Sequence, residues 1–363
     1  MDKTRVLIVD DSAFMRKMIS DFLSEHPLIE VAGTARNGAD ALVKMESTKP
    51  DVVTLDVEMP VMDGIQALKE IMKRFPCPVI MLSSTTQQGA ENTIRSFEYG
   101  AADFIAKPSG PISLDLYKIK EEMQRKVLLA KKINILPISS AQIDINKLPK
   151  QENYSKIGLN KKKYPFFPSD RILPNVIGMG TSTGGPRALQ KVLPLLPEDI
   201  EAPLFIVQHM PAGFTQSLAT RLNQLSKIQV KEAADGEKAV NGTAYIAPGG
   251  RHMTIKKEGA SLYMELDQSP AISGHRPSVD VLFQSLSELA GYQKYALVLT
   301  GMGSDGTEGL KMMKKTGSTI AIAESQATSV VFGMPKSIIA ANLADAVDDI
   351  EMIAVRLMNF IRS

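Results

Sequence analysis

The stretch that decides the fold of the first part of the chain is Val52-Val53-Thr54-Leu55-Asp56, an apolar run of strand length that ends in a carboxylate. Three more strand-like runs end at a polar residue: Val6–Val9 before Asp10, Val79–Leu82 before Ser83, and Asp103–Ala106 before Lys107. Helical patterns such as Phe14–Ser24 and Ala39–Glu46 lie between these runs. Short buried strands that alternate with helices predict an α/β fold, with a parallel sheet covered by helices on both faces.

The polar residues after these strands predict a site. In open α/β sheets, functional groups collect at the carboxyl ends of the strands. Asp10, Asp11 and Asp56 would repel one another there unless a hard cation lay between them, and oxygen ligands suit Mg²⁺. One carboxylate could then accept a phosphoryl group while the ion neutralises charge. Each residue alone is more often a solvated strand end or a helix cap, but their joint arrangement favours a functional site.

These segments carry a family resemblance. Val9-Asp10-Asp11-Ser12, Leu55–Gly64, Leu82-Ser83-Ser84 and Lys107-Pro108 together resemble the receiver domain of response regulators, over roughly residues 3 to 125. The resemblance implies a flavodoxin-like fold and phosphorylation by a histidine kinase. The roles that it implies are Asp56 as phosphoacceptor; Asp11, Asp56 and the backbone carbonyl of Glu58 as Mg²⁺ ligands, with Asp10 helping mainly through water; Ser83 and Phe104 at the switch positions; and Lys107 as the partner of the phosphate.

A second α/β alternation begins at Asn175. Its expected strands are Val176–Gly178, Leu204–Val207, Ala296–Leu299 and Thr319–Ala323. The run Thr243–Ala247, with Val230 and Ile255 nearby, suggests some hairpin material in addition.

Between the two alternations, residues 126–170 lack sustained periodicity. They contain Lys161-Lys162-Lys163, which is more often part of a solvated linker than a docking patch. We therefore expect two doubly wound parallel-sheet domains. Residues 1–125 form the first, residues 126–170 the linker, and residues 171–363 the second, which is Rossmann-like with some antiparallel hairpin.

A glycine-rich turn, Gly178-Met179-Gly180-Thr181-Ser182-Thr183-Gly184-Gly185-Pro186, follows the first strand of the second alternation. A dinucleotide fingerprint would need a third glycine where Thr183 stands, and a phosphate-binding P-loop would need a Gly-Lys-Ser/Thr ending. Gly180-Thr181-Ser182-Thr183-Gly184 instead fits the G-x-S-x-G pattern of a nucleophile turn. A serine also makes a good helix N-cap, so the motif alone is moderate support for a nucleophile.

Two further strand ends supply the partners that a serine nucleophile needs. His209 follows the strand Leu204–Val207, and Asp305 lies in the glycine-rich loop after Ala296–Leu299. A lone histidine is usually a satisfied core residue and a lone loop aspartate usually a turn residue or cap. Their shared position at strand ends favours a base and the carboxylate that orients it. In α/β-hydrolases the histidine comes last, but His275 is the final histidine here, so this would be a separate construction of the triad.

These residues belong to a second resemblance. The segments that carry it are Ile177–Pro186, Gln208-His209-Met210-Pro211, Ala247–Met253, His275–Asp280 and Leu299–Gly306, and they resemble the bacterial chemotaxis protein-glutamate methylesterases. The resemblance implies a hydrolase with Ser182, His209 and Asp305 as its triad and no cofactor for ester hydrolysis. It implies glutamyl methyl esters and certain glutamines of chemoreceptors as substrates, and a chemotaxis kinase as phosphodonor. We expect the backbone N–H of Met302, with one from the Ser182–Thr183 turn, to form the oxyanion hole.

Some assignments stay open at this point. His275, Arg276 and Ser278 either line the substrate cleft or begin a helix with Ser278 as its cap. Two rival functions also remain: a phosphorylation-dependent binding module with an inactive second domain, and a Rossmann-type oxidoreductase. A regulatory hypothesis follows from the domain order: the unphosphorylated receiver covers the mouth of the catalytic site.

Bulk composition excludes several classes of function. The 363 residues suggest about two domains at roughly 150 residues each. A net charge of +2 gives no strong case for nucleic acid, and a single cysteine, Cys77, excludes an internal disulfide framework and a cysteine metal cluster. No apolar stretch approaches the ~18 residues of a membrane span, and Val6–Val9 is too short for a signal segment. We expect a cytoplasmic protein without membrane insertion.

Overall fold

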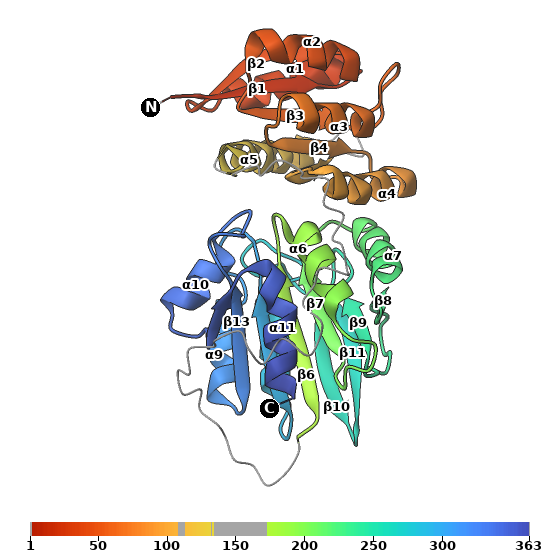
Figure 1. Ribbon diagram of the computed structural model, residues 1–363, viewed down its shortest axis with the longest axis vertical. Helices are drawn as coiled ribbons and strands as arrows, with labels where there is room; N and C mark the ends of the chain where they lie inside the picture. The colour runs from red at the N-terminus through yellow and green to blue at the C-terminus, as the bar shows by residue number, and fades with distance from the viewer. Residues whose placement is uncertain (1, 108–112, 132, 134–172, 363) are drawn as a thin grey trace.

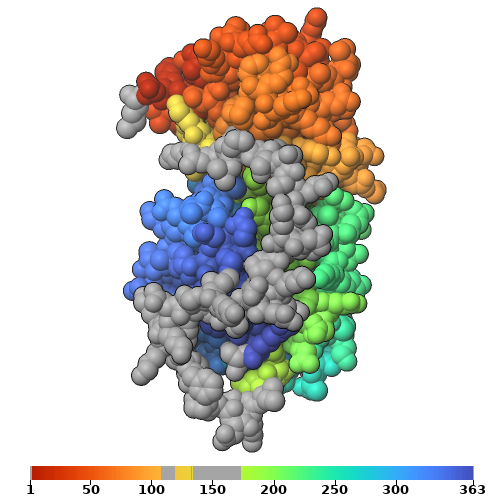
Figure 2. Space-filling model, viewed as in Figure 1, coloured from red at the N-terminus to blue at the C-terminus, as the bar shows by residue number. Residues whose placement is uncertain are grey.

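The computed structural model describes residues 2–107, 113–131, 133 and 173–362, and most of the expected linker 126–170 lies outside these residues. Two α/β units are stacked along the long axis of the molecule, the first in red to yellow and the second in green to blue (Figure 1). Figure 2 shows the same arrangement in space-filling form. No helix in the described part of the chain is long and apolar enough to cross a membrane.

The first unit is a five-stranded parallel sheet with strand order β2-β1-β3-β4-β5. This is the flavodoxin-like order, in which the chain reverses direction across the sheet next to β1. Its elements are β1 (Thr4–Val9), α1 (Ala13–Ser24), β2 (Ile29–Ala35), α2 (Gly38–Thr48), β3 (Val52–Asp56), α3 (Gly64–Arg74), β4 (Val79–Ser83), α4 (Gln87–Ser96), the short 3₁₀ helix η1 (Phe97–Tyr99), β5 (Asp103–Ala106) and α5 (Ser113–Ala130).

Local sequence explains where the helices of the first unit begin. The side chains of Ser12, Asn37, Asp63 and Thr86 each accept a hydrogen bond from a backbone N–H in the first turn of the following helix. Each such cap is worth about 1 kcal/mol. Because β3 and β4 are buried along their whole length, they read as continuous apolar runs instead of alternating ones.

The second unit is a seven-stranded sheet with strand order β14-β13-β12-β6-β7-β9-β8, in which every pair is parallel. An antiparallel hairpin, β10–β11, lies beside it. The elements are β6 (Asn175–Thr181), α6 (Gly185–Val192), the 3₁₀ helix η4 (Leu193–Leu195), β7 (Leu204–Gln208), α7 (Phe214–Leu225), β8 (Gln229–Glu232), β9 (Thr243–Ile246), β10 (His252–Glu258), β11 (Ser261–Asp267), α8 (Val279–Ser287), β12 (Gln293–Val298), α9 (Thr307–Lys315), β13 (Thr319–Glu324), α10 (Met334–Ala340), β14 (Ala346–Asp348) and α11 (Ile350–Ile361).

Helices cover both faces of the second sheet. Residues of α6, α7 and α11 share one buried apolar cluster with alternate residues of β6 and β7, while residues of α8, α9 and α10 form another cluster on the opposite face. Gly180 in β6 permits the close approach of α8, because a Cβ there would lie 2.5 Å from Cγ1 of Val279. The two-sided α/β class predicted from the alternating patterns is confirmed.

Two expectations need correction. Helix α5 runs to Ala130, beyond the boundary expected at residue 125, because Val127 and Ala130 are buried against the first sheet. The hairpin material expected around Thr243–Ala247 and Val230 was also misplaced: β8 and β9 pair in parallel at the edge of the large sheet, and the hairpin is formed by β10, which contains Ile255, and β11. Short apolar runs do not reveal the direction of their partner strands.

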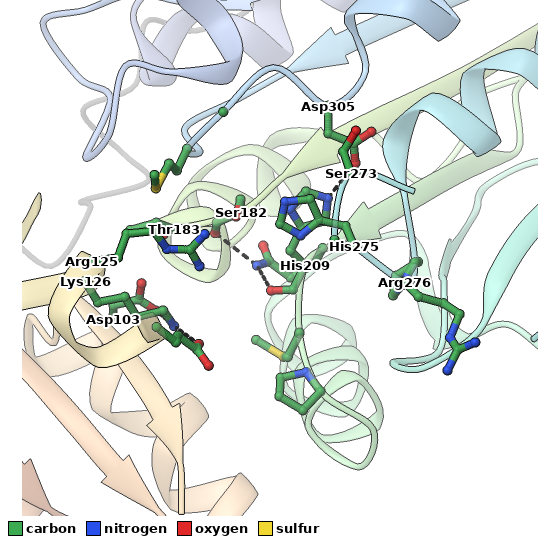
Figure 3. Close-up of a pocket in the computed structure, with 18 of the residues that line it drawn as sticks. Asp103, Arg125, Lys126, Ser182, Thr183, His209, Ser273, His275, Arg276 and Asp305 are labelled. Atoms are coloured by element: carbon green, nitrogen blue, oxygen red, sulfur yellow. Dashed lines mark hydrogen bonds and ion pairs between the residues drawn. The ribbon is translucent and has the colours of Figure 1, made fainter. Parts of the chain in front are cut away.

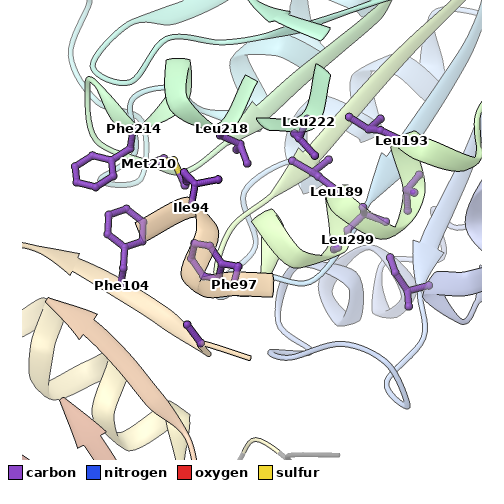
Figure 4. Packing of buried hydrophobic residues seen from close by; sticks show 14 of the residues in the cluster. Ile94, Phe97, Phe104, Leu189, Leu193, Met210, Phe214, Leu218, Leu222 and Leu299 are labelled. Carbon is purple, nitrogen blue, oxygen red and sulfur yellow. The ribbon is translucent and has the colours of Figure 1, made fainter. Parts of the chain in front are cut away.

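The two units pack directly against each other. The ring of Phe104, on β5, lies over that of Phe214 at the start of α7, with centroids 4.6 Å apart. Ile94 of α4 and Phe97 of η1 belong to the same apolar cluster as Met210, Leu218 and Leu222 of the second unit (Figure 4). An ion pair between Glu98 and Arg221 borders this cluster.

Candidate active site

Ser182 lies in the turn between β6 and α6. Its N–H donates to the carbonyl of Thr300 over 3.0 Å, and its own carbonyl accepts from Gly185 N–H and from Nε2 of Gln208. The residue that precedes α6 is Gly184, whose positive φ of 79° suits glycine, so Ser182 is not the cap of this helix. The alternative role that sequence left for Ser182 is therefore not the one it has.

His209 directly follows β7, beside the turn that carries Ser182, because β6 and β7 are neighbouring parallel strands. Its N–H donates to the carbonyl of Thr181, and its Nε2 lies 2.7 Å from Oδ2 of Asp305. Asp305 can only accept, so Nε2 carries the proton of the neutral ring and Nδ1 keeps its lone pair. Nδ1 is buried and has no hydrogen-bond partner among the described residues. It is the ring nitrogen left to act as a base.

Asp305 lies at the N-terminus of α8. Besides His209, its carboxylate accepts from the N–H groups of Val279, Asp280 and Gly306 and from the hydroxyl of Ser278, all within 3.1 Å. Burial alone would raise the pKa of Asp305, but the hydrogen bond and charge of His209 and these N–H donors hold the pKa below its ordinary value. Asp305 therefore stays ionised beside His209.

A second carboxylate makes the reverse connection between the same helices. Oδ1 of Asp280, in the first turn of α8, accepts from the N–H of Gly309 in the first turn of α9. Helices α8 and α9 thus exchange carboxylates at their N-termini, where anions are favoured. Burial, opposed in part by the N–H of Gly309, raises the pKa of Asp280 to about 6. This exchange fixes the loop that carries Asp305.

Ser182, His209 and Asp305 line one cavity of about 560 Å³ (Figure 3). The second unit also contributes Met302 and His275 to the cavity wall. The first unit closes the cavity from the other side, with Asp103, Phe104, Ala106, Glu122, Arg125 and Lys126. The three residues that sequence assigned to a triad are brought together, although no hydrogen bond joins the Ser182 hydroxyl to His209 in the described part of the chain. Such a bond often tightens only when substrate binds.

Of the three residues whose assignment was open, His275 and Arg276 line the cavity and Ser278 does not. The ring of His275 stacks flat on that of His209, with centroids 3.8 Å apart and an interplanar angle of 8°. Burial, together with the charges of His209 and Arg125, lowers the pKa of His275 to about 4. Arg276 borders the cavity but its guanidinium donates to the carbonyls of Gln268 and Ser269. Ser278 is buried and turned to Asp305, away from the cavity.

The candidate oxyanion donors are also sorted by the structure. Ser182 N–H is engaged by Thr300, which leaves Thr183 N–H as the donor of that turn. Met302 lines the cavity with Ser182, in the loop after β12. Sequence reasoning missed Gln208, whose amide nitrogen donates to the carbonyls of both Ser182 and His209. The signal in the sequence was its position immediately before His209, in a segment that carries the second resemblance.

The predicted acidic cluster of the first unit lies at the carboxyl ends of β1 and β3. Asp10, Asp11 and Asp56 each offer a carboxylate oxygen within 4.8 Å of the others. Nζ of Lys107 lies 2.9 Å from Asp10 and 2.7 Å from Asp56. Burial raises the pKa of Asp56 to about 6, although Lys107 opposes this shift. Three carboxylates with one lysine between them fit a hard divalent cation such as Mg²⁺.

The two residues expected at the switch positions make different contacts, Ser83 within the first unit and Phe104 with the second. The hydroxyl of Ser83 donates to the carbonyls of Ser84 and Gly89, the latter in α4. Phe104 is part of the contact with Phe214 described above. The backbone N–H of Glu58 donates to Oδ1 of Asp56 over 3.3 Å, so the segment after β3 folds over this carboxylate.

Comparisons with known proteins agree with both resemblances. A family model described as CheB methylesterase matches residues 177–357, and one described as response regulator receiver domain matches residues 6–116. A protein-glutamate methylesterase/protein-glutamine glutaminase from Geobacillus kaustophilus is 54% identical over 361 residues, covering 99% of each chain. The protein of that name from Bacillus subtilis is 52% identical over 360 residues, covering 99% of this chain and 98% of the relative.

A solved structure supports the second unit in particular. The Thermotoga maritima CheB methylesterase catalytic domain is 43% identical, with a TM-score of 0.51, and covers 52% of this chain and 100% of its own. The resemblances predicted from sequence are confirmed. The chain belongs to the protein-glutamate methylesterase/protein-glutamine glutaminase family, as an enzyme with a response regulator receiver domain in front.

Proposed function

We propose that this enzyme hydrolyses glutamyl methyl esters, and deamidates certain glutamines, on chemoreceptors by means of a Ser182–His209–Asp305 triad. The observation that carries the proposal is the 2.7 Å contact between His209 and Asp305 in the cavity that also holds Ser182. It fixes the tautomer of His209 and leaves Nδ1, buried without a hydrogen-bond partner among the described residues, as the ring nitrogen that could take the Ser182 proton.

The steps follow from this geometry. Ser182 Oγ attacks the side-chain carbonyl carbon of the substrate while Nδ1 of His209 takes the hydroxyl proton. The oxyanion accepts from Met302 and Thr183 N–H. The intermediate collapses as His209 protonates the leaving group, which departs as methanol from an ester or ammonia from an amide. Water, deprotonated by His209, then attacks the acyl-enzyme, and the proton returns to Ser182 as glutamate is released.

Asp305 has an electrostatic role in these steps. It stays ionised, because its oxygens are held by five donors, and so stabilises the imidazolium that forms on His209. His275, which stacks on the ring of His209, remains neutral. A cation at that position would oppose the imidazolium, so the low pKa of His275 supports the proposed chemistry.

We also propose that the receiver inhibits the enzyme until Asp56 is phosphorylated by a chemotaxis histidine kinase. Residues of β5 and α5 close the cavity over Ser182, which would exclude a receptor helix. Phosphorylation would draw the Ser83 hydroxyl away from Gly89 and disturb α4, which packs on α7. A tenfold activation requires only about 1.4 kcal/mol of differential stability.

Mg²⁺ belongs to the regulatory half of this proposal. Asp11, Asp56 and the Glu58 carbonyl would hold it, with Asp10 helping through water, and it would neutralise charge on the transferring phosphoryl group. Lys107, which already contacts Asp56, would bind the phosphate. Ester hydrolysis itself uses no cofactor in this proposal. The proposed substrates and kinase place the enzyme in the cytoplasm.

The deciding experiment is methanol release from methylated receptor membranes, with and without a small phosphodonor plus Mg²⁺. We expect the phosphodonor to stimulate the parent, Asp56→Asn to keep basal activity without stimulation, and Ser182→Ala to release no methanol above background. Equal stimulation of Asp56→Asn and parent would refute the regulatory half.

The same assay separates the rival functions. Activity that survives Ser182→Ala unchanged would favour a binding module with an inactive second domain. Tight binding of a nicotinamide dinucleotide would favour the oxidoreductase. The structure argues against the latter physically, because Val279 packs on Gly180, where a pyrophosphate would have to approach the backbone.

A further inference from the structure

We infer that Ser278 is a fourth, positioning member of the catalytic group, acting on His209 through Asp305; this inference rests on the triad proposed above. The hydroxyl of Ser278 donates to Oδ1 of Asp305 over 2.8 Å. Oδ2 of the same carboxylate faces His209. The two oxygens are thus divided between the base and the serine, so the serine controls how much negative charge Asp305 presents to the base.

The surroundings of Ser278 fix the direction of this hydrogen bond. Ser278 is fully buried, and an ionised carboxylate can only accept, so the hydroxyl proton must point to Asp305. The residue occupies the N-cap position of α8, yet its side chain makes no capping bond to that helix. Its hydroxyl instead donates to Asp305, and Asp305 accepts the hydrogen bonds of Val279 and Asp280 N–H at the start of the helix.

The backbone of Ser278 is hydrogen-bonded to a buried histidine, His252. The N–H of Ser278 donates to Nδ1 of His252 over 3.2 Å, so Nδ1 is unprotonated and Nε2 carries the proton toward the carbonyl of Pro270. His252 is fully buried at the start of β10. A continuous chain of hydrogen bonds therefore runs from His252 through Ser278 and Asp305 to His209, and it ties the hairpin to the base.

The functional consequence is electrostatic. Donation by Ser278 neutralises part of the charge on Asp305, and this limits the proton affinity of His209. Loss of the hydroxyl leaves more charge facing His209, so the imidazolium is favoured and the base is lost at a higher pH. Among the described residues, the other titratable or charged groups around this cluster are His252, His275, Arg276 and Asp280 and, from the receiver, Asp103, Glu122, Arg125 and Lys126. Removing the hydroxyl deletes none of these groups.

The test compares Ser278→Ala, Ser278→Thr and Ser285→Ala in the full chain. Methanol release from methylated receptor membranes, in the presence of phosphodonor and Mg²⁺, is measured against pH at temperatures where melting curves show each variant folded. Ser285 is the matched control, because it is a buried serine of the same helix whose hydroxyl donates to Leu282 and does not touch Asp305.

We expect Ser278→Ala to lower kcat about tenfold with KM unchanged, because Asp305 loses a hydrogen bond that holds it in line with His209. Its acid limb should move up by roughly half a pH unit. Ser278→Thr should restore both values and Ser285→Ala should match the parent. A Ser278→Ala profile equal to the parent overturns the inference while the triad stands. So does a threonine variant as impaired as alanine, or an equal loss in Ser285→Ala. Parent activity that does not depend on His209 would instead refute the triad itself.

Discussion

Two buried aspartates, Asp305 in the loop after β12 and Asp56 at the end of β3, differ in how their charge is compensated. Asp305 accepts from five donors, including three backbone N–H groups, and its pKa is lowered despite burial. Asp56 has Lys107 and the N–H of Glu58 but faces Asp10, and burial raises its pKa to about 6. The carboxylate proposed for catalysis is compensated by the fold itself. The one proposed for regulation is less well compensated, which would suit a residue that receives a cation and a phosphoryl group.

The largest expected effect is that of replacing His209, the proposed base, which is hydrogen-bonded to Asp305. His209→Ala should lower kcat about 10⁶-fold, as for loss of the base of a serine hydrolase, measured as methanol release from receptor membranes. His26→Ala is the control, because this half-buried histidine lies in the receiver, outside the cavity. A loss of less than about tenfold in His209→Ala would contradict the triad.

The next effect concerns Asp305 itself. Asp305→Asn should lower kcat about 10⁴-fold, because an amide can neither fix the tautomer of His209 nor stabilise its imidazolium. It should also destabilise the fold, since its NH₂ group would meet backbone donors. Asp345→Asn is a matched control: this carboxylate also accepts a backbone N–H, that of Ala321, but at the far edge of the sheet. Its kcat should equal that of the parent.

Replacement of Asp56 should stabilise the fold, whereas replacement of Asp305 should destabilise it. Because its folded pKa is raised from 3.8 to about 6, its contribution to stability is present at low pH and is lost as the pH rises through 6. Asp56→Asn should therefore raise the free energy of unfolding of the receiver at pH 8 without Mg²⁺ by about 1–3 kcal/mol, less at pH 5. Urea unfolding at both values is the measurement. Destabilisation at pH 8 would show that the ion pair with Lys107 outweighs the burial of the charge.

The smallest effect tests how the two sites are connected. Arg221→Ala removes the ion pair with Glu98 at the domain contact and should raise basal methanol release by roughly 2–5-fold, as for an ion pair worth up to about 1 kcal/mol. Phosphodonor should then stimulate the variant correspondingly less. Lys311→Ala removes a pair within α9, away from the receiver, and should leave basal activity unchanged. Basal activity equal to that of the parent in Arg221→Ala would show that this ion pair does not contribute to inhibition.

Prediction from sequence was most successful for short apolar strands that are followed by polar residues. The runs at Val52, Val79, Leu204 and Thr319 became strands, and the polar residues after them meet at strand ends because parallel strands share one direction. It was weakest where partners are distant in sequence. The edge strands β8 and β9 looked like hairpin material, since neither their pairing nor its direction is encoded locally. Helix α5 continues beyond its expected end at residue 125, because Val127 and Ala130 are buried in the tertiary structure.

By itself, the sequence determined the α/β class, the two units, and the residues Ser182, His209 and Asp305 as candidates, because motif and strand-end position are local properties of the chain. Only the tertiary structure decided that Ser278 faces Asp305, that His275 stacks on His209, and that the receiver closes the cavity. Each of these contacts joins residues from separate elements, and so depends on how the helices pack against the sheets and on each other.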